Sequence, residues 1–209
     1  LNLVCGSIPL DKGTILINNQ KINTLKEFER YKTIGRVYQD PSKGTCPTMT
    51  ILENMSLADN KNRSFNLSWG TNKKRIDYYK ELLSQLNLGL EDKLGVKVGL
   101  LSGGQRQAMA LLMTTMSPIE ILILDEHTAA LDPKTAEIIM ELTNNIVKKK
   151  KITTLMVTHN LMHALHYGNR LIMMHEGNAI MDLNEQDKKS TSVDNILNVF
   201  NKISLERGN

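Results

Sequence analysis

Two adjacent acidic residues, Asp125 and Glu126, follow the apolar run 121–124. A carboxylate beside a buried segment is costly unless it is paired, bound to a metal or protonated. Neighbouring residues that leave a strand point in different directions, so one carboxylate can hold Mg²⁺ while the other polarises a water molecule. The alternative is a strand that simply emerges into solvent with both acids exposed. Taken alone, the pair fits either interpretation.

A second candidate site lies at residues 101–105, where two glycines stand at the start of a helical pattern. Ser102 and Gln105 have the spacing of a capping box, which predicts a helix that begins directly after Ser102. Glycine lets a ligand approach the backbone closely, and the N-terminus of a helix favours an anion. The segment is therefore a candidate phosphate site, and a plain capped helix is the alternative.

Polar residues also follow two other predicted strands. Gln39 follows the strand predicted at 34–38, and His159 follows the β-rich run 152–157. In open parallel sheets, ligands bind at the carboxyl ends of the strands. The sequence therefore predicts that Gln39, His159 and the acidic pair lie at one edge of a sheet. A single histidine after a strand also has a purely structural explanation.

The elements that must position these residues alternate between strand and helix patterns, which predicts an α/β fold with a parallel sheet. Residues 42–72 are rich in Asn and Ser and are predicted to be mostly loop. The predicted strands are 14–18, 34–38, 121–124 and 152–157, with a terminal hairpin in 171–183; the predicted helices are 73–88, 103–116, 133–148, 160–167 and 193–200.

The composition is that of an ordinary globular protein, with 209 residues, 41% hydrophobic and 23% charged. Apolar runs such as 121–124 and 171–174 are far too short to span a bilayer. Aromatic residues make up only 4%, which argues against a surface that stacks bases, so we expect no nucleic-acid partner. Cys5 and Cys46 lie far apart and indicate a reducing compartment.

Five short segments occur in a fixed order along the chain: 37–40 (VYQD), 101–105 (LSGGQ), 121–126 (ILILDE), 130–132 (ALD) and 157–159 (VTH). In this order they resemble the Q-loop, signature motif, Walker B strand, D-loop and switch histidine of the nucleotide-binding subunits of ATP-binding cassette (ABC) transporters. The resemblance covers essentially the whole chain. It implies a P-loop NTPase (RecA-like) core with a parallel sheet and an inserted α-helical subdomain.

The resemblance divides the chain into a core, 1–40 and 117–209, and a helical subdomain, 41–116, which carries the signature motif. The P-loop G-x-x-x-x-G-K-[S/T] does not occur in the 209 residues. The family has it just before a segment like 1–6, so we expect an N-terminal truncation, and we expect this chain alone to hydrolyse no ATP. His127 stands where most relatives have proline, as in a bacterial subgroup of importers, some proposed to carry aromatic amino acids.

The resemblance also implies ATP and Mg²⁺ as ligands and a role for each polar residue. Asp125 would help to hold the Mg²⁺, and Gln39 would complete its coordination shell. Glu126 would activate the attacking water, and His159 would contact the γ-phosphate. Asp132 would reach across a dimer interface towards the opposite active site.

The signature residues Ser102, Gly103, Gly104 and Gln105 would cover the γ-phosphate of ATP bound to a second subunit. Two chains would then complete each active site, which implies a head-to-tail dimer. The family resemblance further implies a transmembrane permease subunit, a peripheral location at the cytoplasmic face of the membrane, and import of an amino-acid-like solute. Two alternatives stay open: a soluble ABC-type ATPase unconnected with transport, and a non-hydrolysing binding module.

Overall fold

The computed structural model describes residues 1–63 and 70–205. The chain divides into two compact units, Leu1–Val157 and Thr158–Asn209. The elements of the first unit are α1 (Asn2–Cys5), β1 (Leu16–Ile17), β2 (Gln20–Lys21), α2 (Glu27–Arg30), β3 (Ile34–Val37), the 3₁₀ turn η1 (Pro41–Lys43), α3 (Ile51–Asp59), η2 (Lys73–Arg75), α4 (Ile76–Ser84), η3 (Val98–Leu100), α5 (Gly103–Met116), β4 (Ile121–Asp125), α6 (Pro133–Lys150) and β5 (Thr153–Val157).

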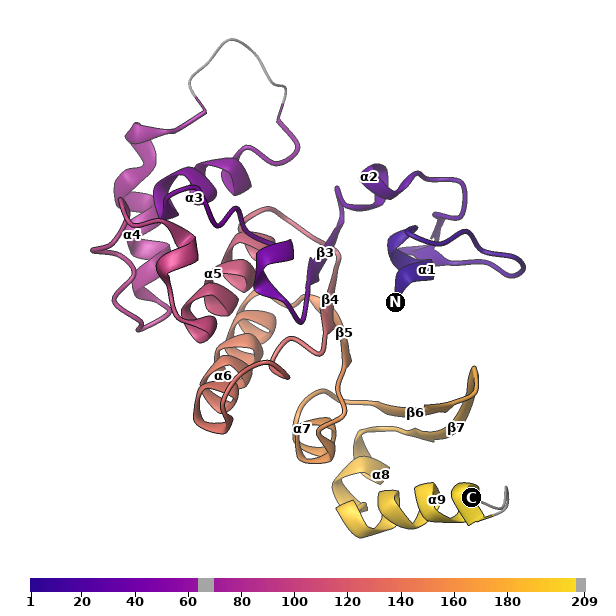
Figure 1. Ribbon diagram of the computed structural model, residues 1–209. Helices are drawn as coiled ribbons and strands as arrows, with labels where there is room; N and C mark the ends of the chain where they lie inside the picture. Colours follow the sequence, from indigo (N-terminus) through magenta and orange to yellow (C-terminus); the bar gives the residue numbers. More distant parts are fainter. Residues whose placement is uncertain (64–69, 206–209) are drawn as a thin grey trace. The chain divides into compact units, whose positions relative to one another are not determined.

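The centre of the first unit is a parallel three-stranded sheet in the order β3-β4-β5 (Figure 1). In the middle strand, Ile121 pairs with Ile34 on one side and with Thr153 on the other. Since helices connect these strands, the predicted α/β fold with a parallel sheet is confirmed.

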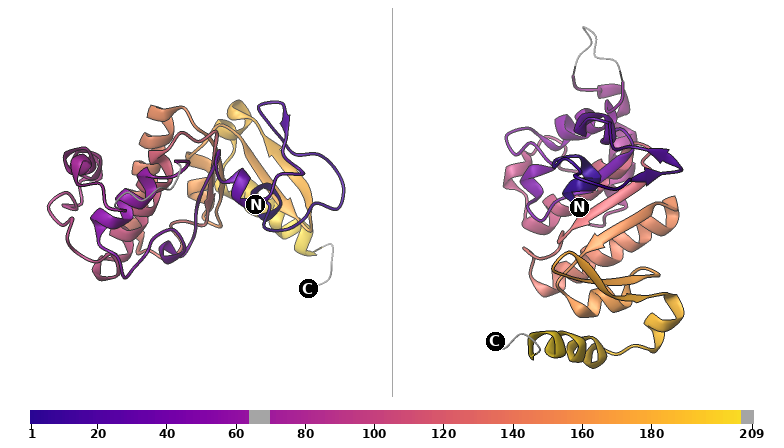
Figure 2. Two further views of the ribbon diagram at one scale, coloured as in Figure 1. Left: turned by 90° about the horizontal axis from the view of Figure 1, so that it is seen from above. Right: turned by 90° about the vertical axis from the view of Figure 1, so that its right-hand side faces the viewer.

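Alternate residues of the middle strand face opposite sides of the sheet. Leu122 and Leu124 pack with Val37 and with apolar side chains of α5 and α6. Ile123 packs on the other side with Cys5 and with residues of the β1–β2 hairpin. The left view of Figure 2 shows the long helices on one side of the strands and the N-terminal elements on the other. Asp125 shares the side of Ile123, two residues further on.

Helices α3, α4 and α5 share an apolar cluster that includes Met55, Leu83 and Met109. Helix α3 begins at a capping box in which the Glu53 amide donates to the Thr50 hydroxyl at 3.3 Å and the Thr50 amide donates to the Glu53 carboxylate at 2.7 Å. The predicted loop at 42–72 is therefore wrong for α3, because its capped start and buried side chains favour a helix despite the polar surroundings. Residues 64–69 of that prediction lie outside the described residues.

Two predicted helix starts are confirmed. Ser102 is the N-cap of α5, and Asp132 is the N-cap of α6 with Pro133 as the first helical residue. The helix predicted at 73–88 is wrong at its end, since α4 stops at Ser84 and Asn87 has a left-handed φ of 53°. The predicted boundaries between a core and a helical subdomain at 41–116 stay a prediction.

The second unit contains the predicted terminal hairpin and the predicted last helix. Its turn residues Glu176 and Gly177 have φ values of 46° and 81°, as a two-residue hairpin loop requires. Leu171 and Met173 of the hairpin pack against Ile196. The elements are α7 (Leu161–His166), β6 (Leu171–His175), β7 (Asn178–Leu183), α8 (Glu185–Ser190) and α9 (Val193–Leu205).

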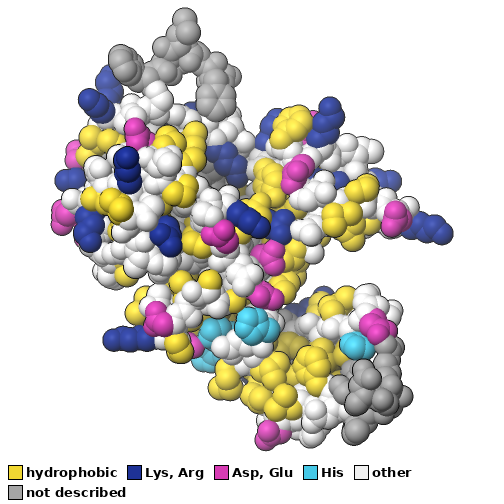
Figure 3. All heavy atoms as spheres, in the orientation of Figure 1, with side chains coloured by type: hydrophobic (Ala, Val, Ile, Leu, Met, Phe, Trp, Pro, Cys, Tyr) yellow, Lys and Arg dark blue, Asp and Glu magenta, His cyan; other side chains and the backbone are white. Residues whose placement is uncertain are grey.

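Across the described ranges 1–63 and 70–205, no helix is both long enough and apolar enough to cross a bilayer. On the face of the first unit drawn in Figure 3, Lys and Arg side chains are interspersed with Asp and Glu side chains. That face therefore has no extended field of a single sign.

Candidate functional site

A cavity of about 850 Å³ lies in the first unit, where β3 and β4 end and α5 begins. This volume is in the range of small-molecule and cofactor sites. Of the predicted site residues, Gln39, Asp125 and Gly103 line it. Its charged lining residues are three basic and two acidic side chains: Arg36, Lys43, Arg106, Asp40 and Asp125. The excess of basic groups suits a phosphate-bearing ligand.

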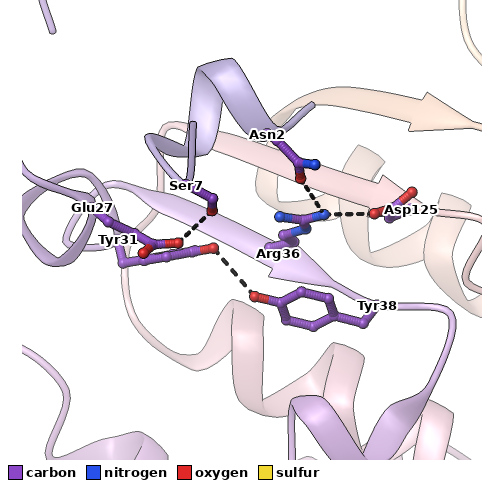
Figure 4. A network of polar contacts seen from close by, with 7 residues as sticks. All are labelled: Asn2, Ser7, Glu27, Tyr31, Arg36, Tyr38 and Asp125. Carbon is purple, nitrogen blue, oxygen red and sulfur yellow. Dashed lines mark hydrogen bonds and ion pairs between the residues drawn. The ribbon is translucent and has the colours of Figure 1, made fainter. Parts of the chain in front are cut away.

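Asp125 is paired with Arg36, a residue that the sequence motifs did not single out. The Arg36 Nη2 lies 2.6 Å from Asp125 Oδ2 and 3.0 Å from Asn2 Oδ1 (Figure 4). The Arg36 side chain is 9% exposed, whereas the Asp125 side chain is 33% exposed. Arg36 pairs in register with Ile123, so strand alternation puts Arg36 and Asp125 on one side of the sheet.

Two tyrosines support the Arg36 side chain. The guanidinium carbon lies 4.7 Å from the centre of the Tyr38 ring, a cation–π contact. The hydroxyls of Tyr31 and Tyr38 lie 3.2 Å apart, and burial followed by this hydrogen bond raises the pKa of Tyr31. Burial disfavours the charge of Arg36, yet its hydrogen bonds with Asp125 and Tyr31 outweigh that cost and raise the pKa of Arg36. The network fixes one carboxylate oxygen of Asp125.

The polar groups at this cavity fit Mg²⁺ only together with a ligand that brings its own oxygens. Mg²⁺ is usually held by one or two carboxylates, with water and substrate phosphates as the other ligands. Asp125 contributes a carboxylate and Gln39 an amide oxygen to the same cavity. Among the described residues, no group of three His, Cys, Asp or Glu side chains could hold a metal ion.

Glu126 occupies a sharp turn directly after β4. Its φ is 46°, in the left-handed region that few residues other than glycine adopt. Its amide donates to the Val157 carbonyl at 3.0 Å, and its carbonyl accepts from the Ala129 amide at 2.9 Å. The backbone therefore leaves the strand direction at Glu126, whereas Asp125 is still part of β4.

The signature motif forms a capped helix start. The Gln105 amide donates to the Ser102 hydroxyl at 3.2 Å, and the Ser102 amide donates to Gln105 Oε1 at 3.1 Å. A Cβ atom on Gly104 would collide with Thr135 Cγ2, whereas one on Gly103 would lie 3.4 Å from Leu131 Cδ2. Gly104 is thus required by packing against α6, and Gly103 leaves backbone exposed to the cavity.

Asp132 also acts as a helix cap. Its Oδ1 accepts from the Thr135 amide at 3.1 Å. Hydrogen bonds from the Thr135 hydroxyl and amide lower the pKa of Asp132, which is exposed. The carboxylate is therefore ionised and accessible at the start of α6.

A side chain of α5, Gln107, which no sequence motif singles out, connects α5 to the end of β3. Gln107 is buried, and its Nε2 donates to the Tyr38 carbonyl at 3.0 Å. The next residue, Gln39, is exposed. Gln39 is thus a solvent-facing residue that follows directly after an anchored strand end.

His159 lies at the start of the second unit and is exposed there. Its predicted place beside Gln39 and the acidic pair stays a prediction. The structure therefore places only the first-unit residues of the predicted sheet edge, Gln39 and the acidic pair.

This geometry can be compared with known proteins. The family model described as "ABC transporter" matches residues 1–129, which is more than half of the chain. The chain belongs to the ABC transporter family. As an ATP-binding subunit of that family, it has the ABC cassette fold of P-loop NTPases that its motifs predict.

One relative of this ABC subunit is the tyrosine transport ATP-binding protein of Clostridioides difficile (strain R20291). The two are 47% identical over 200 residues, which cover 96% of this chain and 79% of the relative. A similar solved structure is cbiO1 from Clostridium perfringens, described as part of the ABC transporter complex cbiONQ. It has a TM-score of 0.74 and 25% identity, over 96% of this chain and 76% of that chain.

A second solved structure is the dimeric, post-hydrolysis ATP-binding cassette MJ0796 bound to ADP and Pi. Its TM-score is 0.71 with 29% identity, over 88% of this chain and 78% of that chain. These matches agree with an ATP-binding subunit whose cavity lies at the ends of parallel strands.

Proposed function

We propose that this ABC subunit hydrolyses ATP with Mg²⁺ and powers the import of an amino-acid-like solute. The 47% identity with a tyrosine transport ATP-binding protein supports the solute class. The observation that carries the chemistry is that Asp125 lines a cavity of about 850 Å³ with Gln39, beside the turn that holds Glu126.

In this proposal, each of the predicted site residues has one task. Asp125 and Gln39 would hold the Mg²⁺, which would supply positive charge to neutralise the phosphates. Glu126, at the turn that follows Asp125, accepts the proton of the attacking water. His159 contacts the γ-phosphate, and Asp132 presents its ionised carboxylate to a second subunit.

A head-to-tail dimer follows from the signature motif. Gly103 offers backbone at a helix N-terminus, while Ser102 and Gln105 use their side chains in the cap. Such a site binds an anion but holds no acid or base for hydrolysis. We therefore propose that Ser102, Gly103, Gly104 and Gln105 cover the γ-phosphate of ATP bound to a partner subunit.

A transmembrane permease is the second proposed partner, and it places the subunit at the cytoplasmic face of the membrane. The contact region lies between 39–54 and α4. Asn54 organises this region, since it accepts from the Cys46 amide at 2.8 Å and donates to the Thr50 carbonyl at 2.9 Å. The Ile51 amide donates to the Val96 carbonyl at 3.0 Å, which connects the region to the segment before the signature motif.

The 209 residues contain no G-x-x-x-x-G-K-[S/T] motif. The backbone amides and lysine of that motif supply most phosphate contacts in P-loop proteins. We therefore expect the 209-residue chain by itself to bind ATP weakly and to hydrolyse none at a useful rate. Magnesium-dependent turnover by the purified chain, free of other ATPases, would contradict this expectation.

The test of the function is Glu126→Gln in the protein expressed from its native gene. The amide keeps the shape but removes the base, so we expect ATP binding to persist and hydrolysis to fall about 10²-fold or more. Glu141→Gln, an exposed acid in α6, is the matched control and keeps normal turnover. Turnover of Glu126→Gln near that of wild type would remove Glu126 from its role.

Uptake of labelled tyrosine by membrane vesicles that carry the native complex tests the transport step. We expect uptake to depend on ATP and to disappear in Glu126→Gln. If the native protein hydrolyses ATP but purifies with no membrane subunit, the protein is a soluble ABC-type ATPase and the transporter hypothesis fails. If it binds ATP but does not hydrolyse it, the protein is a binding module and both ATPase hypotheses fail.

A further inference from the structure

We infer that His127 is a positioning residue for Glu126, and this inference rests on the proposed role of Glu126 in hydrolysis. His127 follows Glu126 directly, at the turn between β4 and α6. Its ring anchors this turn to the body of α6 through Thr143.

Both residues of this contact, His127 and Thr143, are buried. His127 is 2% exposed and Thr143 is 3% exposed. His127 Nε2 lies 3.2 Å from Thr143 Oγ1. Burying a polar ring without a hydrogen bond costs free energy, so buried rings are usually hydrogen-bonded. The hydrogen bond with Thr143 therefore determines where the His127 ring lies.

The direction of this hydrogen bond follows from the second contact of Thr143. Its hydroxyl donates to the Ile139 carbonyl at 2.6 Å, and a hydroxyl has one proton to donate. The oxygen must therefore accept from the histidine, which means that Nε2 of His127 carries a proton. Two consecutive hydrogen bonds therefore connect His127 Nε2 through Thr143 Oγ1 to the Ile139 carbonyl in the backbone of α6.

The anchor lies where the turn needs support. Glu126 has a left-handed φ of 46°, a conformation that is unfavourable outside glycine and persists only where its surroundings impose it. The Leu131 amide donates to the Thr128 carbonyl at 3.2 Å, and Asp132 caps α6. The turn is thus held at its end by Asp132 and next to Glu126 by His127.

We therefore expect that loss of the His127–Thr143 bond lets Glu126 leave its position without unfolding the chain. His127→Leu removes the donor, and Thr143→Val removes the acceptor with nearly the same shape. His127→Gln keeps an N–H at about the reach of Nε2, and Thr143→Ser keeps the hydroxyl. The two conservative variants are the matched controls for the two disruptive ones.

The experiment measures ATP turnover of the native-gene protein and amide hydrogen exchange of residues 126–132. For His127→Leu and Thr143→Val we expect kcat to fall about tenfold with KM for ATP unchanged, and exchange in the turn to rise at least about tenfold. His127→Gln and Thr143→Ser should stay within about twofold of wild type in both measurements. Melting curves establish that all four variants are folded at the assay temperature.

The inference is overturned if both disruptive variants keep the wild-type kcat, or if the conservative variants lose as much as the disruptive ones. Wild type and Glu126→Gln are assayed in the same series. If wild type hydrolyses no ATP, the proposed function fails, and hydrogen exchange in the turn still decides whether His127 anchors it. Unchanged exchange in both disruptive variants overturns the anchor regardless of turnover.

Discussion

The turn after β4 and the turn before α5 both lead into a capped helix, but they present different chemistry to the cavity. Before α5, Ser102 and Gln105 hydrogen-bond each other's backbone, and glycine backbone is what remains for a ligand. At the end of β4, Asp125 lines the cavity as a carboxylate, and its charge is balanced by Arg36 of the neighbouring strand β3.

Neither turn by itself is therefore a complete ATPase site. A helix start with glycines binds phosphate but cannot accept a proton, whereas a pair of acids repels phosphate unless a cation is present. A site that hydrolyses ATP needs both kinds of group around one γ-phosphate. Within one chain, Gly103 and Asp125 already line the same cavity. In the proposed head-to-tail dimer, the glycine turn of each chain would cover the ATP bound to the partner chain.

An acidic residue in the glycine turn should have the largest effect. Gly103→Asp should lower ATP turnover of the native protein at least about tenfold, because the new carboxylate faces phosphate charge. An acid in the first turn of a helix is favourable, so the melting temperature should not fall. Normal turnover with a normal melting curve would exclude the signature turn from the active site.

Gly104→Ala separates packing from ligand binding within the same motif. The new methyl group collides with Thr135 Cγ2, so the free energy of unfolding should fall by about 1–3 kcal/mol, less the gain of up to about 1 kcal/mol in helix propensity. Urea denaturation of the purified chain measures this. Thr135→Ser removes the colliding methyl group and should restore stability in the double variant, while Gly103→Ala should cost little.

Arg36→Met tests whether burial makes the Arg36–Asp125 ion pair contribute to the free energy of unfolding. We expect a loss of about 1–2 kcal/mol in unfolding free energy, since Asp125 is one-third exposed and can be partly rehydrated. The matched control is Arg170→Met, because Arg170 and Asp182 also lie 2.6 Å apart but are both exposed. That control should cause no resolvable change; equal losses in the two variants would show that burial is irrelevant here.

A double-mutant cycle with Asp125→Asn isolates the coupling between Arg36 and Asp125. If the cycle gives no coupling, the effect of Arg36→Met comes from Asn2 and the tyrosines instead.

The smallest expected effect is the pH dependence of the Asp132 cap. Its pKa is lowered in the folded state, so its contribution to stability is fully present above the unfolded value of about 3.9 and is lost as the pH falls through the folded value. Asp132→Asn keeps a capping side chain without the charge. We expect wild type to melt above Asp132→Asn at pH 7, with the difference in melting temperature decreasing steadily as the pH falls below about 4. A constant difference between pH 3 and pH 7 would contradict this.

Much of the fold and part of the site could be predicted because local interactions decide them. The starts of α5 and α6 depend on Ser102, Gln105 and Asp132, whose side chains hydrogen-bond residues only three positions away. The buried strand β4 and its terminal acids follow from an apolar run that ends in charges. The start of helix α3 is equally local, because Thr50 and Glu53 form a capping box, although the polar residues around it are typical of a loop.

The tertiary structure alone decided which residues meet over long distances in the chain. Arg36 and Asp125 are 89 positions apart and come together because β3 and β4 pair in one particular register. Gln107 reaches the Tyr38 carbonyl only because α5 packs on the sheet. Residue type and spacing do not predict such pairs. For Arg36 the register of the strand decides, since a shift by one residue would place its side chain on the other side of the sheet.

The same distinction applies to the two residues after β4. The sequence by itself determined that an acid, Glu126, follows Asp125 in an ABC motif. Only the structure decided that Glu126 turns with a left-handed φ and that His127 is buried against Thr143. The physical reason is that a motif specifies chemical groups, while the position of each group depends on packing contacts from distant parts of the chain.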